Sequence, residues 1–121
     1  MTQKSELGRL GEDLACKYLV DKGYRIIGRN FRKPWGEIDI ITKAPNKTLV
    51  FVEVKTMTES RTGLKPEDQL THSKLGKLQK TASLYAGHYP EKVSTKGWRM
   101  DLITIIIEVG KSPKIEQYEN I

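Results

Sequence analysis

Cysteine is nearly absent from this sequence, since Cys16 is the only one, and so no disulfide can form within the chain. Cys16 lies among apolar residues with helical spacing, and we interpret it as a packing residue and not as a nucleophile. No apolar run approaches the ~20 residues that a membrane-spanning helix needs. The first residues, MTQKSELGRLGEDLACKYL, also lack the apolar segment of a secretory signal. We therefore expect a cytoplasmic protein.

Low-complexity tracts, internal repeats and linkers are missing as well, so the 121 residues predict one domain over residues 1–121. Charge, by contrast, is plentiful, and the formal net charge is +6 at pH 7. A small basic protein is biased toward polyanions, of which nucleic acid is the commonest. A merely solubilising surface would carry the same excess, so the charge alone does not decide between the two.

The apolar spacing predicts an α/β fold. The expected segments are a helix over 5–22, a strand over 24–31, two strands within 36–56, a loop over 58–65, a helix over 73–86, a strand over 98–109 and a short edge strand over 114–118. Gly8 and Gly11 each weaken the first helix by about 1 kcal/mol relative to Ala. We therefore expect them where another backbone approaches the helix closely.

The stretch GEIDIITKAPNKTLVFVEVKT, residues 36–56, predicts a β-hairpin. Its turn is the three residues Pro45-Asn46-Lys47, in which Asn46 or Lys47 takes the left-handed conformation. A turn centred on Asn46 gives a register in which the expected pairs on one face are Ile38–Val54, Ile40–Val52 and Thr42–Val50, and on the other Ile41–Phe51, Asp39–Glu53 and Glu37–Lys55. A one-residue shift would oppose apolar and polar faces, whereas a two-residue shift would keep the faces and stays open.

In this register the carboxylates of Asp39 and Glu53 repel each other across neighbouring strands. The repulsion disappears when one acid is protonated or when a cation lies between them. Two oxygen donors of this kind suit Mg²⁺ or Mn²⁺. Lys55 lies on the same face as Glu53, and an acidic pair beside a lysine is what metal-assisted phosphodiester hydrolysis requires. The alternative is a solvated charge ladder in which Lys55 bridges to Glu37 and Glu53.

The motifs GEIDII and VFVEVKT resemble the core of the PD-(D/E)XK nuclease superfamily, which has the element order αβββαβ and a mixed sheet flanked by helices. More closely, the chain resembles the YraN family of small bacterial proteins, which are related to Holliday-junction resolvases. The stretches that carry this resemblance are GEDLACKYLVDKGYRIIGRNFR, GEIDII, VFVEVKT, KLGKLQKTASLY and WRMDLI. They extend over nearly all of the chain up to about Val109.

The resemblance implies that Asp39 and Glu53 are ligands of Mg²⁺ or Mn²⁺ and that Lys55 is the catalytic lysine. It also implies that Glu12, on the first helix, joins the catalytic and metal site; a solvated helix glutamate is the alternative. Ile38 stands where the superfamily signature has proline. Glu37 is either an extra acid or a salt-bridge partner of Lys55.

Several other residues have two interpretations. The expected nucleic-acid contacts are Arg29, Arg32, Lys33, Arg61 and Lys74. Lys74 resembles a position where related nucleases place Gln or Lys, although a solvated lysine fits equally. Trp35 and Trp98 either stack on bases or pack at the edge of the core.

Asp101, in WRMDLI, matches an acidic residue on the family's late strand. We favour a structural role for Asp101, with Arg99 as its salt-bridge partner, because the two residues share one face of the strand. His72 and His88 lack the spacing of metal ligands.

Together these observations predict a divalent-metal-dependent endonuclease that acts on nucleic acid, most plausibly branched or single-stranded DNA. The alternatives are a nucleic-acid-binding adaptor that keeps the nuclease fold without turnover, and a protein-interaction module. The resemblance to resolvases allows a homodimer, but no apolar stripe in the sequence predicts one.

Overall fold

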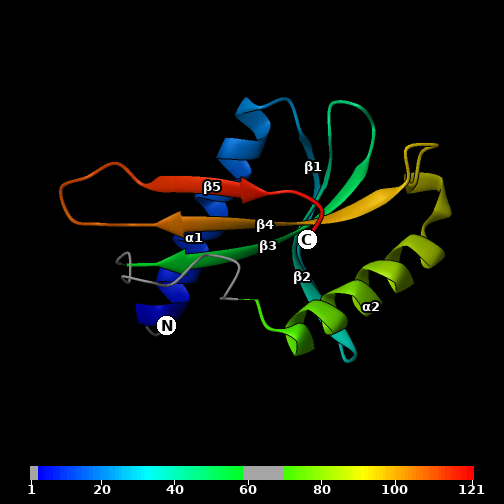
Figure 1. Ribbon diagram of the computed structural model, residues 1–121, viewed down its shortest axis with the longest axis horizontal. Coiled ribbons are helices and arrows are strands. Elements are labelled where there is room, and N and C mark those ends of the chain that lie inside the picture. Colours follow the sequence, from blue (N-terminus) through cyan, green and yellow to red (C-terminus); the bar gives the residue numbers. More distant parts are fainter. Residues whose placement is uncertain (1–2, 59–69) are drawn as a thin grey trace.

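The computed structural model describes residues 3–58 and 70–121 (Figure 1). Its elements are α1 (Gln3–Asp21), β1 (Arg25–Lys33), β2 (Gly36–Lys43), β3 (Leu49–Met57), α2 (His72–His88), the short 3₁₀ helix η2 (Pro90–Lys92), β4 (Trp98–Ile106) and β5 (Lys114–Tyr118). The αβββαβ order predicted from the sequence is confirmed, and 114–118 does form the additional edge strand. Apart from Thr58, the loop expected over 58–65 lies outside the described residues.

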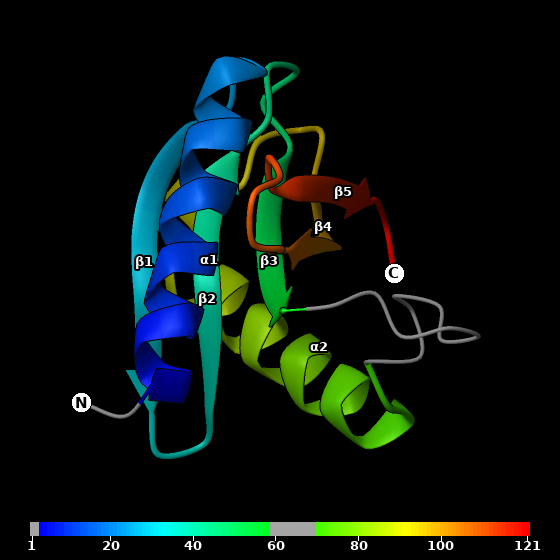
Figure 2. The same cartoon turned by 90° about the vertical axis from the view of Figure 1, so that its left-hand side faces the viewer.

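The five strands form one mixed sheet in the order β1-β2-β3-β4-β5. β3 and β4 are parallel, and the other neighbouring pairs are antiparallel. The parallel pair requires a crossover, and α2 lies in the connection between its two strands. Figure 2 shows α1 on one side of the sheet and α2 on the other. No helix in the described part of the chain is long and apolar enough to cross a membrane.

The turn of the β2–β3 hairpin is the predicted one. Lys47 takes the left-handed conformation, with a φ of 79°. The side-chain oxygen of Asn46 accepts a hydrogen bond from the backbone N–H of Thr48 (3.0 Å), which is a typical way for Asn to stabilise a turn. Near this turn the predicted register is confirmed, since Ile40 pairs with Val52 and Ile41 with Phe51.

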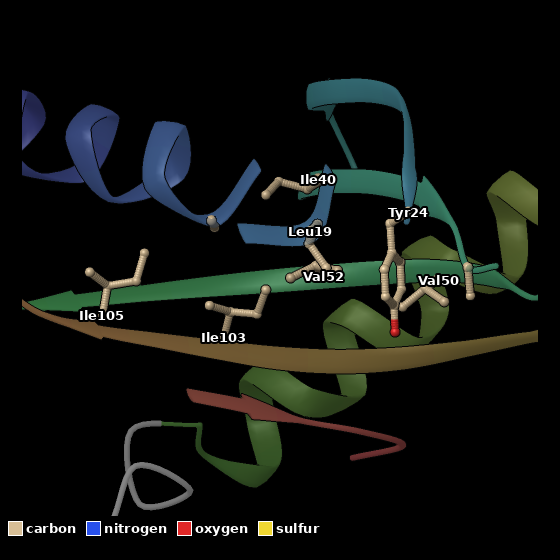
Figure 3. Packing of buried hydrophobic residues seen from close by; sticks show 9 residues of the cluster. Leu19, Tyr24, Ile40, Val50, Val52, Ile103 and Ile105 are labelled. Atoms are coloured by element: carbon tan, nitrogen blue, oxygen red, sulfur yellow. The ribbon is translucent and has the colours of Figure 1, made fainter. Parts of the chain in front are cut away.

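Two apolar layers lie on opposite faces of the sheet. The layer under α1 contains Leu19, Ile40, Val52 and Ile103 among its buried residues (Figure 3). The layer under α2 is built from Ile38, Ile41, Leu49, Phe51, Leu78, Ala82, Tyr85 and Met100. Burial of such side chains stabilises the fold by about 25 cal/mol per Å² of apolar surface.

The placement of Ile38 corrects the sequence analysis. We expected Ile38 on the same face as Ile40, but it belongs to the layer under α2, whereas Ile40 lies under α1. The strict two-residue alternation of β2 therefore ends between these positions. The register with β3 extends from Lys43 only as far as Ile40. Beyond that point β2 is free to twist, because no ladder with β3 holds its faces.

Both helices approach the sheet where a small residue permits it. A Cβ atom on Gly11 of α1 would lie 1.8 Å from Oγ1 of Thr56 in β3, and one on Gly36 would lie 1.9 Å from Oγ1 of Thr81 in α2. The close approach expected at Gly11 is therefore present, although it is to a side chain and not to a backbone. The expectation for Gly8 is wrong, since no described atom lies within 4 Å of a Cβ built there.

We predict that Gly11→Ala destabilises the protein by about 1–3 kcal/mol, because the methyl group overlaps Thr56 and forces α1 away from β3. The matched control is Gly8→Ala, in the same helix and with open space around it, which should stabilise by about 0.5–1 kcal/mol. Urea unfolding monitored by circular dichroism measures both. Equal free energies of unfolding for the two variants would contradict the close contact.

Candidate functional site

The candidate site lies where β2 and β3 separate. Among the described residues, the register of this pair runs from Lys43–Leu49 to Ile40–Val52. The pairs Asp39–Glu53 and Glu37–Lys55 that we predicted are therefore not part of it. β3 meanwhile stays paired with β4 as far as Met57. The two strands consequently diverge, as Figures 1 and 2 show. Their hydrogen-bond ladder is interrupted beside the outer half of β3, and we call this interruption the gap.

The side chain of Asp39 occupies this gap. Its Oδ2 accepts a hydrogen bond of 2.8 Å from the backbone N–H of Val54. A buried backbone N–H has to find an acceptor, and in a continuous ladder the backbone of β2 would supply it. The carboxylate of Asp39 takes that role instead, so it lies near the plane of the sheet and not on either face. This hydrogen bond could not be predicted from a regular hairpin, in which Asp39 would pair with Glu53 and the backbone of β2 would accept from Val54.

Asp39 is in an environment that disfavours its charge. Burial, together with the negative charges of Glu12 and Glu37, raises the pKa of Asp39 from 3.8 to about 6. The hydrogen bond from Val54 and the positive charge of Arg32 act in the opposite direction but do not prevent the rise.

The pKa of Glu53 is shifted further than that of Asp39. Burial, followed by the charges of Asp39 and Glu37, raises the pKa of Glu53 from 4.5 to about 8. The ammonium groups of Lys74 and Lys55 oppose this shift. Glu53 therefore senses Asp39 from β2, Lys55 from its own strand and Lys74 from α2. The predicted acids act on each other electrostatically, although not through the register that we expected.

Glu12 reaches the same region from α1. Its side chain is 18% exposed and lies 3.9 Å from the guanidinium of Arg29. The contact between Gly11 and Thr56 sets the neighbouring residue of α1 against β3. From there the charge of Glu12 contributes to the raised pKa of Asp39. Glu12 is thus a partly buried helix glutamate, not a fully solvated one.

The donor atoms available for a cation are few. No group of three or more His, Cys, Asp or Glu side chains within 3–58 and 70–121 is close enough to hold a metal ion. The site therefore offers Asp39 and Glu53 as a pair of oxygen donors. Mg²⁺ characteristically binds one or two carboxylates and fills its remaining positions with water and phosphate oxygens, so this donor set fits such an ion.

The predicted nucleic-acid contacts are only partly available. Arg29 donates a 2.7 Å hydrogen bond to Asp13, and the guanidinium of Arg32 lies 3.6 Å from the carboxylate of Glu37. Glu37 therefore pairs with Arg32, which is a third arrangement beside the two that we considered for it. Both arginines are exposed, so these pairs are weak and solvent-screened.

Two of the three remaining predicted contacts, Lys33 and Lys74, are described, and they lie in different places. Lys33 lies over the ring of Phe31, with Nζ 5.6 Å from the ring centroid. Lys74 is exposed on the first turn of α2, where its charge acts on Glu53. Arg61 is outside the residues that the structure describes.

Asp101 is structural, as the sequence favours. It is fully buried, and its carboxylate accepts hydrogen bonds from Arg99 (3.0 Å), from the side chain of Gln117 (2.8 Å) and from the backbone N–H of Asn120 (3.0 Å). Arg99 also donates to the hydroxyl of Tyr24. Gln117 and Asn120 were missed because they come from the far end of the chain, and no local pattern marks them.

Comparison with known proteins shows the family. A sequence model of the "Uncharacterised protein family UPF0102" matches residues 11–105, which is most of the chain. The three antiparallel strands, the crossover helix and the parallel fourth strand have the element order of a PD-(D/E)XK nuclease-like fold, as the resemblance implies. The chain belongs to UPF0102, the YraN family that its sequence resembles.

The sequence matches to the relatives cover nearly the whole length of both chains. A UPF0102 protein of Syntrophomonas wolfei is 42% identical over 107 residues, which cover 88% of this chain and 90% of the relative. A UPF0102 protein of Thermodesulfovibrio yellowstonii is 42% identical over 95% of this chain and 94% of its own. One from Bifidobacterium longum is 33% identical over 95% and 91%. None of these three names states an activity.

Among solved structures, SfsA of Pyrococcus furiosus in complex with Ca²⁺ is similar, with a TM-score of 0.39 and 15% identity. The match covers 96% of this chain and 63% of that one. A likeness at this level carries no argument about function.

We predict that the metal-free protein loses stability as the pH rises from about 4.5 to about 8. Over this range the folded state keeps the proton of Glu53 that the unfolded state has lost, so unfolding becomes easier with increasing pH. Asp39 adds to the loss between about 3.8 and about 6. Glu53→Gln should therefore stabilise the protein at pH 8 by on the order of 2 kcal/mol and should flatten the pH dependence.

Urea unfolding in EDTA at pH 5 and pH 8 checks this prediction. Glu91→Gln, an exposed glutamate in η2, is the matched control and should keep the pH dependence of the wild type. If wild type and Glu53→Gln had the same pH dependence, the burial of Glu53 would not matter energetically.

Proposed function

We propose that this protein is a divalent-metal-dependent endonuclease-like protein that hydrolyses phosphodiester bonds in nucleic acid, with branched or single-stranded DNA as its substrate. The observation that carries the proposal is the pair of partly buried carboxylates, Asp39 and Glu53, with raised pKa values, beside Lys55 where β2 and β3 diverge. A protein that needed only a stable sheet would gain nothing from two mutually repelling acids in this gap.

The roles of the residues follow from their chemistry. Asp39 and Glu53 would hold Mg²⁺ or Mn²⁺ through their oxygens, and Glu12 would add negative charge from α1. The cation supplies Lewis-acid polarisation of the phosphate and lowers the pKa of a bound water. Lys55 donates hydrogen bonds to the scissile phosphate and stabilises the charge that develops there.

Protonation controls the cation's access. Carboxylates bind a divalent ion in their ionised form, so Glu53 would have to release the proton that it keeps up to about pH 8 before it could hold one. The affinity for Mn²⁺ should therefore rise between pH 6 and pH 8, with release of protons. Calorimetric titration of wild type, Asp39→Asn and Glu53→Gln measures the affinity directly.

The partner we propose is DNA, in the cytoplasm, and a homodimer is the assembly we propose for cleaving two equivalent strands. The net charge of +6 and the exposed Arg29, Arg32, Lys33 and Lys74 support binding to a polyanion.

The second candidate is an adaptor that binds nucleic acid without cleaving it. The observation in its favour is that the described residues contain no group of three or more metal-ligating side chains. Salt-dependent binding that survives Glu53→Gln, without cleavage in any metal, would favour this candidate.

We predict that Asp39→Asn and Lys55→Gln each reduce cleavage of branched or single-stranded DNA by at least about 100-fold with Mg²⁺ or Mn²⁺. Asp21→Asn and Lys80→Gln are matched controls, because they make the same chemical changes at exposed positions of α1 and α2, and they should cleave like the wild type. Equal background in all five proteins would leave the catalytic proposal without support.

A further inference from the structure

A second surface lies on the α2 side of the β1–β2 hairpin. It is a pocket of about 220 Å³ lined by Phe31, Lys33, Trp35, Tyr85, His88 and Tyr89. This volume is below the ~300–1,000 Å³ of sites for drug-sized ligands. It suits the insertion of one flat ring and not the enclosure of a whole ligand.

The floor of this pocket is rigid. Tyr85 is 5% exposed, and its ring makes edge contacts with Phe31 (5.3 Å between centroids) and Phe51 (5.5 Å). Phe51 is a fully buried residue of the layer under α2. The pocket is therefore anchored to the core.

The rim of the pocket offers aromatic surface to solvent. Trp35 is 39% exposed and Tyr89 is 37% exposed. The ring of Trp35 is 6.1 Å from that of Phe31, and the ring of Tyr89 is 4.7 Å from that of Tyr85. Exposed aromatic rings held by buried ones lose little conformational entropy when a ligand stacks on them.

The charges around the pocket are positive. Nζ of Lys92 lies 5.2 Å from the centroid of the Tyr89 ring and donates a 3.3 Å hydrogen bond to the hydroxyl of Tyr85. Lys33 lies over Phe31 on the other side. The residues that line the pocket include no carboxylate. Aromatic rings flanked by lysines are what sequence-tolerant single-strand binding surfaces use, since bases stack on the rings and phosphates contact the cations.

The two tryptophans have different roles, which the sequence left open. Trp98 packs on Phe51, with 5.5 Å between ring centroids, and it is part of the layer under α2. Of the two tryptophans, Trp35 lines the pocket and Trp98 does not.

The pocket is also close to the candidate site along the sheet. Phe31, in its wall, is the register partner of Ile38, which directly precedes Asp39. A strand bound at the pocket would therefore pass near the divergence of β2 and β3. A base that is paired within a duplex has its faces covered by its neighbours and cannot enter.

We propose that this pocket binds an unpaired nucleobase, which stacks on Trp35 and Tyr89 while Lys33 and Lys92 contact the flanking phosphates. The proposal rests on the proposed function for the kind of ligand. It adds that the substrate carries unpaired nucleotides beside the scissile bond. Duplex DNA without a single-stranded part would bind through phosphates alone.

The fluorescence of Trp35 tests stacking directly. In Trp98→Phe, Trp35 is the only tryptophan of the chain. In EDTA, which prevents cleavage, an oligothymidylate should quench this fluorescence, whereas a duplex of equal length should not. Trp98→Phe changes a core residue, so a second measurement avoids this variant. The quenching of Trp35 is then the difference between the quenching of the wild type and that of Trp35→Phe.

Affinity gives an independent test. Trp35→Ala and Tyr89→Ala should each weaken binding of oligothymidylate about tenfold by fluorescence anisotropy and should leave duplex binding unchanged. Trp35→Phe should retain most of the affinity. Leu84, an exposed apolar residue of α2 that does not line the pocket, provides the matched control, and Leu84→Ala should bind like the wild type.

The possible outcomes separate the two proposals. Binding of the oligonucleotide without quenching, or an equal effect of the alanine variants on single strands and duplex, would overturn stacking and leave the nuclease proposal intact. Quenching together with no cleavage in any metal would support stacking and favour the adaptor. No binding of any nucleic acid at low salt would overturn both.

Discussion

The hydrogen bond from the backbone N–H of Val54 to the carboxylate of Asp39 is the interaction on which the candidate site depends. β3 is paired with β4 along its whole length, whereas the first residues of β2 pair with β1 and not with β3. A backbone donor of β3 therefore has no ladder partner in β2 and has to be satisfied in another way. Asp39 satisfies it, and the same bond holds a carboxylate in a partly buried position. The raised pKa values of Asp39 and Glu53 follow from that placement.

The two helices complete the electrostatics from opposite faces. α1 brings Glu12 toward Asp39, because Gly11 lets the helix lie against Thr56 of β3. α2 brings Lys74 toward Glu53 from the other side. One acid is thus surrounded mainly by negative charge, while the other also senses two lysines. A cation in the gap would offset the negative charges around Asp39. A phosphate near Lys55 and Lys74 would be attracted by their ammonium groups.

The net charge overstates the number of basic side chains that are available to bind a polyanion. Arg29 and Arg32 pair with acids, and Arg99 is committed to the buried Asp101. A lysine contributes more to binding when it lies beside another group that can contact the same ligand. Lys74 lies near the carboxylate of Glu53, and Lys33 lies over the ring of Phe31. Among the described residues, these basic side chains therefore lie in different chemical surroundings.

Much of this protein could be predicted from the sequence by itself. The order of elements, the hairpin turn at Asn46 and Lys47, the pairing of Ile41 with Phe51 and the bond between Arg99 and Asp101 all depend on local spacing, and local spacing is visible in the chain. The choice of Asp39, Glu53 and Lys55 as candidates also came from that pattern and from the family resemblance.

Only the tertiary structure decided how the acids meet. A periodic pattern assumes that two strands stay together, and so it placed Asp39 opposite Glu53 and Ile38 beside Ile40. β2 is paired with β3 only from Ile40 to Lys43, and its earlier residues pair with β1 while Ile38 packs in the layer under α2. These contacts join segments distant in the sequence, so no local pattern predicts them. The same reason applies to the aromatic pocket, because its walls come from β1, from the turn before β2 and from the end of α2, segments that only the packing of α2 on the sheet brings together.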